Sequence, residues 1–146
     1  MKLLIINGPN LNLLGVREKN VYGTMSYTNM CEYIHIEAKK LDVEIQIVQS
    51  NTEGEIINFL HNAMGKFQGV IINPGAYTHY SYAIHDAIKG ICIPTVEVHL
   101  SNIHAREEFR SKSVTAPACV GQISGFGHYG YVMGIMAQLK HIEKDM

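Results

Sequence analysis

Glu97 and His99 have the residue types and the spacing of an acid–base pair. They close an apolar run, 91–99, that is typical of a β-strand, in which side chains two positions apart point to the same face. A carboxylate beside an imidazole orients the ring and favours its protonated form, as a general acid requires. The ordinary alternative is a pair of polar residues solvated at the end of a strand.

Arginine is rare in this chain, and its three copies are Arg17, Arg106 and Arg110. The planar guanidinium suits bidentate binding of a carboxylate, so the arginines are candidates for contact with an acidic ligand. Arg106 and Arg110 are four residues apart in a segment, 102–110, that predicts one or two helical turns, and there they would share one face. Pairing with neighbouring surface glutamates is the commonplace explanation.

Two further segments carry polar residues. The segment 7–23 is long for a connection between a strand and a helix, and it holds Arg17, Tyr22 and several asparagines. Long loops in compact domains are often lids, and a surface loop with asparagine-capped turns is the alternative. The turn 73–79 could present backbone N–H groups and Asn73 to an anionic ligand, although ordinary turn chemistry also explains it.

The hydrophobic pattern predicts a scaffold for these residues in which strands and helices alternate. Ser26 is the expected N-cap of the first helix, and Gly90 is expected to end the third. Gly130 and Gly134 share a face of the last helix and allow close packing against another backbone. The expected strands are 2–6, 43–48, 69–72, 91–99 and 118–124, the fourth of them beginning around Pro94, and the expected helices are 27–41, 53–67, 83–88 and 129–142.

Five strands joined by helical crossovers predict an α/β fold: a flavodoxin-like three-layer sandwich with a five-stranded parallel sheet of order 2-1-3-4-5. Residues 1–146 are expected to form a single domain, because no linker, charge block or repeat interrupts them. Ligands of such sheets bind beyond the carboxyl ends of the strands, where the strand order reverses. The candidate residues follow strands one, three and four, as this rule requires.

Composition narrows the classes of function. A formal net charge of -1 lacks the excess of positive charge that nucleic-acid binding needs. The longest apolar run is far shorter than the ~20 residues that cross a bilayer, so neither a signal peptide nor a membrane span is expected. Cys31, Cys92 and Cys119 are odd in number and lie in apolar segments, which favours buried reduced thiols and a cytoplasmic location.

Three other patterns are rejected as functional sites. The G-x-G-x-x-G match at 125–130 has no following strand and no acidic residue about 20 positions on, so a packing turn is expected. The numerous histidines lack the spacing of a metal motif, so no metal is expected. No G-x-S-x-G occurs, and Ser81, Ser101 or Asp86 alone do not make a hydrolase triad.

Several long motifs, in the right order and spanning nearly the whole chain, closely resemble type II 3-dehydroquinate dehydratases. They are 7–15 (NGPNLNLLG), Arg17-Glu18, Tyr22-Gly23, 49–54 (QSNTEG), 72–79 (INPGAYTH) and 97–110 (EVHLSNIHAREEFR). The length and the flavodoxin-like fold of that family agree with the pattern described above. The resemblance implies conversion of 3-dehydroquinate to 3-dehydroshikimate in the shikimate pathway, by anti elimination through an enolate, without metal, cofactor or Schiff base.

The resemblance also assigns roles to single positions. Tyr22 would be the base, His99 the general acid and Arg17 a cation of the lid, with Asn10 and Glu97 in support. Because a tyrosine has an unperturbed pKa of about 10, Tyr22 needs a nearby cation such as Arg17 to stabilise its phenolate. The implied substrate contacts are Asn73, His79, Asp86, Leu100, Ser101 and Arg110.

Two positions depart from the family pattern. Lys19 stands where a proline often follows Arg-Glu, and His85 stands where an arginine often precedes Asp86. The first is expected to loosen the lid. The second is expected to alter subunit contacts, because the resemblance implies a homo-oligomer, a dodecamer of four trimers, in which Asp86 reaches a neighbouring subunit.

Two other classes of function stay open from the residues alone. A non-catalytic module that senses a small acid or a nucleotide would not need reactive types at both the base and the acid positions. A flavin-binding redox domain would copurify with a yellow cofactor. Tyr22, Arg17 and His99 are all present, which favours the enzyme.

Overall fold

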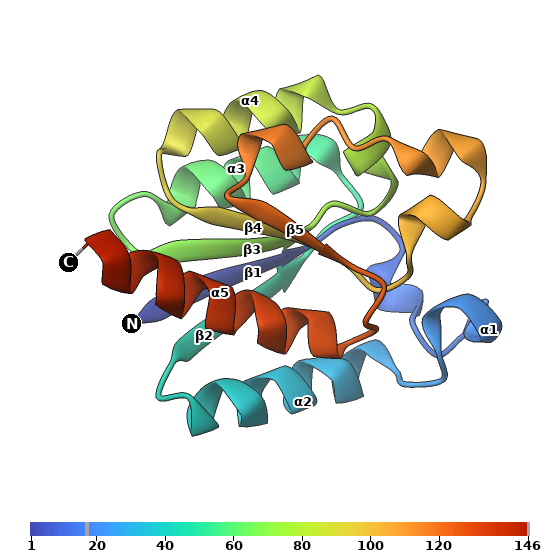
Figure 1. Cartoon of the computed structure of the whole chain (residues 1–146), viewed down its shortest axis with the longest axis horizontal. Helices are drawn as coiled ribbons and strands as arrows, with labels where there is room; N and C mark the ends of the chain where they lie inside the picture. The colour runs from blue at the N-terminus through green and yellow to red at the C-terminus, as the bar shows by residue number, and fades with distance from the viewer. Residues whose placement is uncertain (17, 146) are drawn as a thin grey trace.

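The computed structural model describes residues 1–16 and 18–145, and at position 22 the backbone alone. Its centre is a sheet of five parallel strands in the order β2-β1-β3-β4-β5, as the sequence predicts (Figure 1). The strands are β1 (Lys2–Asn7), β2 (Glu44–Gln49), β3 (Gly69–Asn73), β4 (Thr95–His99) and β5 (Gly121–Ser124). The strand order reverses between β1 and β3, so a ligand site is expected there.

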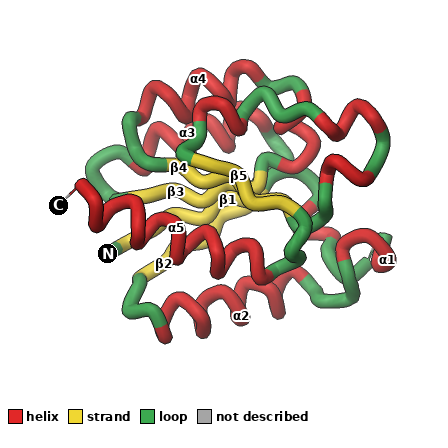
Figure 2. Tube along the Cα trace, in the orientation of Figure 1, coloured by secondary structure: helices red, strands yellow, loops and turns green. Residues whose placement is uncertain are grey.

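Helices cover both faces of the sheet and complete a three-layer sandwich (Figure 2). α2 (Tyr27–Lys40) and α5 (Tyr129–Asp145) cover one face, and α3 (Glu53–Ala63) and α4 (Tyr82–Ile91) cover the other. The connections hold a short helix, α1 (Lys19–Tyr22), and the 3-10 turns η1 (Leu11–Leu13), η2 (Gly75–His79), η3 (Ile103–Ala105), η4 (Glu108–Ser111) and η5 (Ala116–Ala118). A hydrophobic cluster fills each side of the sheet. The flavodoxin-like α/β prediction is confirmed.

The local sequence explains the main elements. Ser26 caps α2, because its Oγ accepts a hydrogen bond of 3.1 Å from the backbone N–H of Asn29. β3 and β4 are buried along their whole length, as continuous apolar runs predict for strands covered on both faces. β2 lies at an edge of the sheet and is partly exposed.

Two glycines let α5 approach the sheet closely. A Cβ atom on Gly130 would lie 3.1 Å from Cγ1 of Val98, and one on Gly134 would lie 3.4 Å from atoms of Ile71 and Val98. The predicted close packing at these glycines is therefore confirmed, although the atoms that they approach belong to side chains of the sheet and not to a backbone. The contact holds α5 against β4, the strand that ends at His99.

Several element boundaries differ from the sequence prediction. Gly90 does not end α4, which runs on to Ile91 and stops where Cys92 adopts a left-handed backbone with φ of 53°. α3 ends at Ala63, four residues before the expected end at position 67. β4 begins at Thr95, directly after Pro94, as expected, whereas β5 begins later than expected because the 3-10 turn η5 stands where this strand was expected to start.

The cysteines only partly match their prediction. All three are free, but Cys92 is exposed whereas Cys31 and Cys119 are half-buried. The prediction of buried thiols was wrong for Cys92, because this residue ends a helix at the surface instead of standing inside a strand. Among the helices of residues 1–16 and 18–145, none is both long and apolar enough to span a bilayer.

Candidate active site

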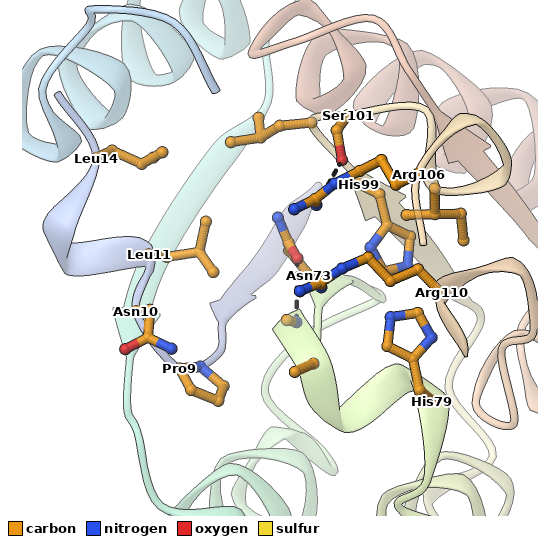
Figure 3. A pocket seen from close by; sticks show the side chains of 14 residues that line it. Pro9, Asn10, Leu11, Leu14, Asn73, His79, His99, Ser101, Arg106 and Arg110 are labelled. Atoms are coloured by element: carbon orange, nitrogen blue, oxygen red, sulfur yellow. Dashed lines mark hydrogen bonds between the residues drawn. The ribbon is translucent and has the colours of Figure 1, made fainter. Parts of the chain in front are cut away.

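A pocket of about 110 Å³ opens beyond the carboxyl ends of β1, β3 and β4 (Figure 3). The segments that follow these strands supply its walls, as the reversal of strand order predicts. Its polar side chains belong to Asn10, Asn73, His79, His99, Ser101, Arg106 and Arg110, and its apolar ones to Pro9, Leu11, Leu14, Ala76, Leu100 and Ile103. Two guanidinium groups and several neutral hydrogen-bonding groups suit this pocket to a small, hydroxylated anion.

The acid–base pair meets this pocket at the end of β4. Nε2 of His99 lies 2.9 Å from Oε2 of Glu97, so strand alternation brings the two side chains together as predicted. Glu97 is fully buried and His99 is 6% exposed. A carboxylate can only accept, so the proton between them belongs to Nε2, and Nδ1 is the nitrogen left for the pocket. Within the described part of the chain, Nδ1 has no hydrogen-bond partner.

Glu97 is a buried charge held by several donors. Its oxygens accept hydrogen bonds from His99, from Thr78 at 3.1 Å, from Ser113 at 2.9 Å, from Gln122 at 2.6 Å and from Thr115. Burial raises the pKa of the Glu97 carboxyl, but the hydrogen bond and the charge of His99, with the hydroxyl and amide donors, outweigh it and hold that pKa below its usual value. The ionised carboxylate therefore fixes the orientation of the imidazole.

His79 is a neutral hydrogen-bonding group that lies on the same side of the pocket as His99 (Figure 3). Its Nδ1 lies 2.7 Å from the backbone carbonyl of Lys112, which only accepts, so Nδ1 donates and Nε2 is an acceptor. Burial lowers the pKa of His79, and the positive charge of Arg110 acts in the same direction. A neutral imidazole with an accepting Nε2 can bind a hydroxyl group of a ligand.

Arg110 is held in place by two neighbours. Its Nε donates to Oε2 of Glu107 at 2.6 Å, and its guanidinium lies 4.6 Å from the centre of the Phe109 ring. Phe109 in turn packs edge-on against His79, with the ring centres 5.8 Å apart. These contacts place the cation at the mouth of the pocket beside His79 (Figure 3).

Arg106 also lines the pocket, but from a different backbone position than predicted. η3 ends at Ala105, and Arg106 follows with an extended backbone before η4 begins, so the two arginines do not share a helical face. Nη1 of Arg106 donates to Oγ of Ser101 at 3.2 Å, and Nη2 lies 4.0 Å from Oε2 of Glu18. Arg106 thus connects the wall of the pocket to the segment that follows β1.

Asn73 and Asn10 follow the neighbouring strands β3 and β1. Asn73 is 3% exposed: its Oδ1 accepts from the N–H of Gly75 at 3.2 Å, and its Nδ2 donates to the hydroxyl of Tyr131 at 3.1 Å. Asn10 has a left-handed backbone with φ of 70°, and its N–H donates to Oδ1 of Asn51 at 3.0 Å. Both residues line the pocket.

The structure gathers most of the residues predicted for the site. Asn10, Asn73, His79, His99, Leu100, Ser101 and Arg110 line one pocket, with Glu97 behind His99. Asp86 lies elsewhere, on α4, where its side chain is 80% exposed beside the groove between α3 and α4. Arg17 and the side chain of Tyr22 lie outside the described residues.

Sequence reasoning missed two parts of the site. Arg106 was a candidate for contact with an acidic ligand but was not among the implied substrate contacts, although it lines the pocket. The donors around Glu97 come from η2, from the segment before η5 and from β5, and their only signal is that a carboxylate inside a buried strand needs hydrogen-bond partners. Among the described residues, no group of three or more His, Cys, Asp or Glu side chains could hold a metal ion.

The strand order, together with a histidine–carboxylate pair at the carboxyl ends of the strands, defines a flavodoxin-like α/β protein with a site suited to proton transfer. Comparison with known proteins agrees with this class and narrows it. The chain belongs to the dehydroquinase class II family, whose model matches residues 1–139.

Sequence and structure comparisons give near relatives. A 3-dehydroquinate dehydratase of Clostridium perfringens (strain SM101) is 67% identical over 144 residues, which cover 98% of this chain and 99% of that protein. The crystal structure of type II dehydroquinase from Butyrivibrio crossotus has a TM-score of 0.94 at 50% identity and covers 95% of this chain and 97% of its own. The crystal structure of type II dehydroquinase from Propionibacterium acnes has a TM-score of 0.92 at 36% identity and covers 95% of this chain and 96% of its own.

The low pKa of Glu97 predicts a pH-dependent contribution to stability. A carboxyl whose pKa is lower in the folded state stabilises the fold above its unfolded value, 4.5, and this contribution is lost as the pH falls through the folded value. Glu97→Gln should therefore reduce the free energy of unfolding by about 2 kcal/mol at neutral pH, because the amide loses charged hydrogen bonds. The difference from wild type should shrink below pH 4.5.

Urea unfolding at several pH values and equal protein concentrations measures this difference. Glu32→Gln is the matched control, because Glu32 is an exposed glutamate of α2. A stability difference between wild type and Glu97→Gln that stays constant on acidification would contradict an ionised, hydrogen-bonded Glu97.

Proposed function

We propose that this chain is a 3-dehydroquinate dehydratase, which eliminates water from 3-dehydroquinate to give 3-dehydroshikimate in the shikimate pathway. The observation that carries the proposal is the buried Glu97–His99 pair. It leaves Nδ1 of His99 for a pocket lined by two arginines and neutral polar groups. Membership of the dehydroquinase class II family supports the same reaction.

The proposed chemistry needs one base and one acid. The C3 carbonyl of 3-dehydroquinate acidifies the proton on C2, so removal of that proton gives an enolate. The hydroxyl on C1 then leaves as water once an acid protonates it. His99 is the proposed acid: Nδ1 donates the proton, and the ionised Glu97 stabilises the imidazolium before transfer.

Tyr22 is the proposed base, and Arg17 is the cation that stabilises its phenolate. Both belong to the segment after β1 and are five residues apart, with Tyr22 ending α1. The approach of Glu18 to Arg106 supports the assignment, because it brings this segment to the wall of the pocket. Asn10 is proposed to stabilise the enolate oxygen.

The other lining residues are proposed to bind the substrate. Asn73 and the backbone amides near Leu100 and Ser101 would hold its carboxylate. His79, through Nε2, and Arg110, through its guanidinium, would bind ring hydroxyls, since both line the pocket and both pack against Phe109.

The first test is turnover itself. Purified protein incubated with 3-dehydroquinate should form the conjugated enone of the product, seen by its absorbance. The activity should survive EDTA, and borohydride should trap no lysine, because the acid–base steps need neither a metal nor an imine. Tyr22→Phe and His99→Ala should fold normally, as judged by circular dichroism, yet lose roughly a hundredfold or more in kcat.

These outcomes separate the proposal from its rivals. A sensor module would bind 3-dehydroquinate without forming the enone, and a flavin domain would copurify yellow. Near-normal kcat in either variant would exclude the role assigned to that residue.

Arg17 gives a second test, because its charge should lower the pKa of the Tyr22 phenol. Arg17→Gln should raise that pKa, move the pH–rate profile upward and reduce kcat more than substrate affinity. Arg17→Lys should rescue the activity partly, because an ammonium keeps the charge but lacks the planar fork. If Arg17 only clamps the substrate carboxylate, KM would rise while kcat and the titration of Tyr22 stayed unchanged.

Asp86 is proposed to complete the site of a neighbouring subunit in a homo-oligomer, a dodecamer of four trimers. The exposure of its side chain on α4, away from the pocket of its own chain, supports this arrangement. His85, one of the departures from the family pattern, contacts Asp86 through Nδ1 and Oδ1 at 3.1 Å, so the carboxylate keeps a basic neighbour.

Subunit complementation tests this arrangement. Asp86→Ala and His99→Ala should each be inactive as homo-oligomers, whereas oligomers refolded from their mixture should regain activity at sites that combine one intact His99 with an intact Asp86 from the neighbour. A mixture of Asn73→Ala with His99→Ala is the control, since both groups belong to one pocket. An active monomer in sedimentation, or no recovery in the first mixture, would reject the proposal.

A further inference from the structure

Tyr131 joins two strand ends beside the pocket through a single hydroxyl. It stands in the first turn of α5 and is fully buried. Its hydroxyl donates to Oδ1 of Asn7 at 2.6 Å and accepts from Nδ2 of Asn73 at 3.1 Å. Asn7 and Asn73 are paired in register at the carboxyl ends of β1 and β3. The hydroxyl of α5 therefore reaches the place where the strand order reverses.

The directions of these bonds fix the side-chain amide of Asn73. Its Oδ1 is engaged by the N–H of Gly75, so Nδ2 faces the tyrosine. The Tyr131 hydroxyl donates its hydrogen bond to Asn7, so its oxygen is able to accept one from Nδ2 of Asn73. One proton of Nδ2 is used in this bond, and the second is left for a ligand in the pocket that Asn73 lines.

Tyr131 is not placed to react with a ligand itself. The residues that line the pocket include Asn73 but not Tyr131. Burial raises the pKa of the Tyr131 phenol and outweighs the opposite effect of the hydrogen bond from Asn73, so the hydroxyl stays neutral. Any effect of this hydroxyl on the reaction passes through Asn73.

We propose that Tyr131 is a positioning residue for substrate binding, which holds the Asn73 amide in the orientation that binds the substrate carboxylate. The inference rests on the proposed function, in which Asn73 makes that contact. The competing role is packing alone, because the Tyr131 ring also belongs to the hydrophobic cluster between α5 and the sheet. The two roles differ in what removal of the hydroxyl does to substrate affinity.

Tyr131→Phe keeps the ring and removes the hydroxyl. Without it, Nδ2 of Asn73 and Oδ1 of Asn7 lose a buried partner, and the amide is free to turn. KM for 3-dehydroquinate should rise about tenfold while kcat changes less than about twofold, because the carboxylate is bound alike in the ground state and the transition state.

Ile135→Val is the matched control, because Ile135 is fully buried one turn further along α5 and packs in the same cluster. It should lower the melting temperature by a few degrees and leave KM unchanged. A KM for Tyr131→Phe equal to that of Ile135→Val would overturn the proposal. In an Asn73→Ala background, Tyr131→Phe should raise KM no further, whereas two effects that multiply would show that Tyr131 does not act through Asn73.

A measurement without turnover separates this inference from the proposed function. In the ligand-free wild-type protein, the Asn73 side-chain amide protons should exchange slowly with solvent, and in Tyr131→Phe they should exchange faster. If the wild type forms no enone, the proposed function fails, but slow exchange that becomes faster in Tyr131→Phe still shows that Tyr131 holds the amide. Exchange as fast as that of an exposed asparagine would overturn the inference, even if Tyr131→Phe failed to fold.

Discussion

The buried charge of Glu97 is the constraint on which the site depends. An ionised carboxylate taken out of water is destabilising by several kcal/mol unless hydrogen bonds replace its hydration, roughly the scale of a whole domain's stability. Here the donors come from η2, from the segment before η5, from β5 and from His99 itself. Satisfying one carboxylate therefore requires these segments to converge behind β4, and that convergence also builds the wall of the pocket.

A second buried cluster consists of neutral polar side chains that are hydrogen-bonded to one another. Asn7, Asn73 and Tyr131 are polar side chains placed in the interior at the ends of β1 and β3, and each satisfies another. Gly130 and Gly134 let α5 lie close enough to the sheet for the neighbouring tyrosine to take part. Among the described residues, only Oε1 of Gln138 is a buried side-chain polar atom without a partner, so neither cluster leaves an orphaned group.

The sequence predicted the strand order and the gathering of His99, Asn73 and Arg110, because apolar periodicity and the rule for parallel sheets depend on residue type alone. It did not predict the donors around Glu97, since hydroxyls in irregular segments follow no period. The predicted end of α4 was wrong for a related reason: the glycine expected to end the helix lies within it, and Cys92, two residues later, takes the left-handed position. For Arg106 the sequence left a ligand contact and a surface ion pair open, because an arginine beside glutamates fits both.

Acid and base are supplied by different kinds of structure. The proposed acid, His99, ends a strand that is buried along its length, and its orientation is set by a carboxylate that is itself surrounded by donors. The proposed base, Tyr22, ends a four-residue helix whose neighbours Lys19 to Val21 are exposed. Few buried contacts stabilise such an element, so its position responds to small interactions such as the approach of Glu18 to Arg106. Because Arg106 also donates to Ser101, one guanidinium connects the pocket wall with the segment that carries the proposed base.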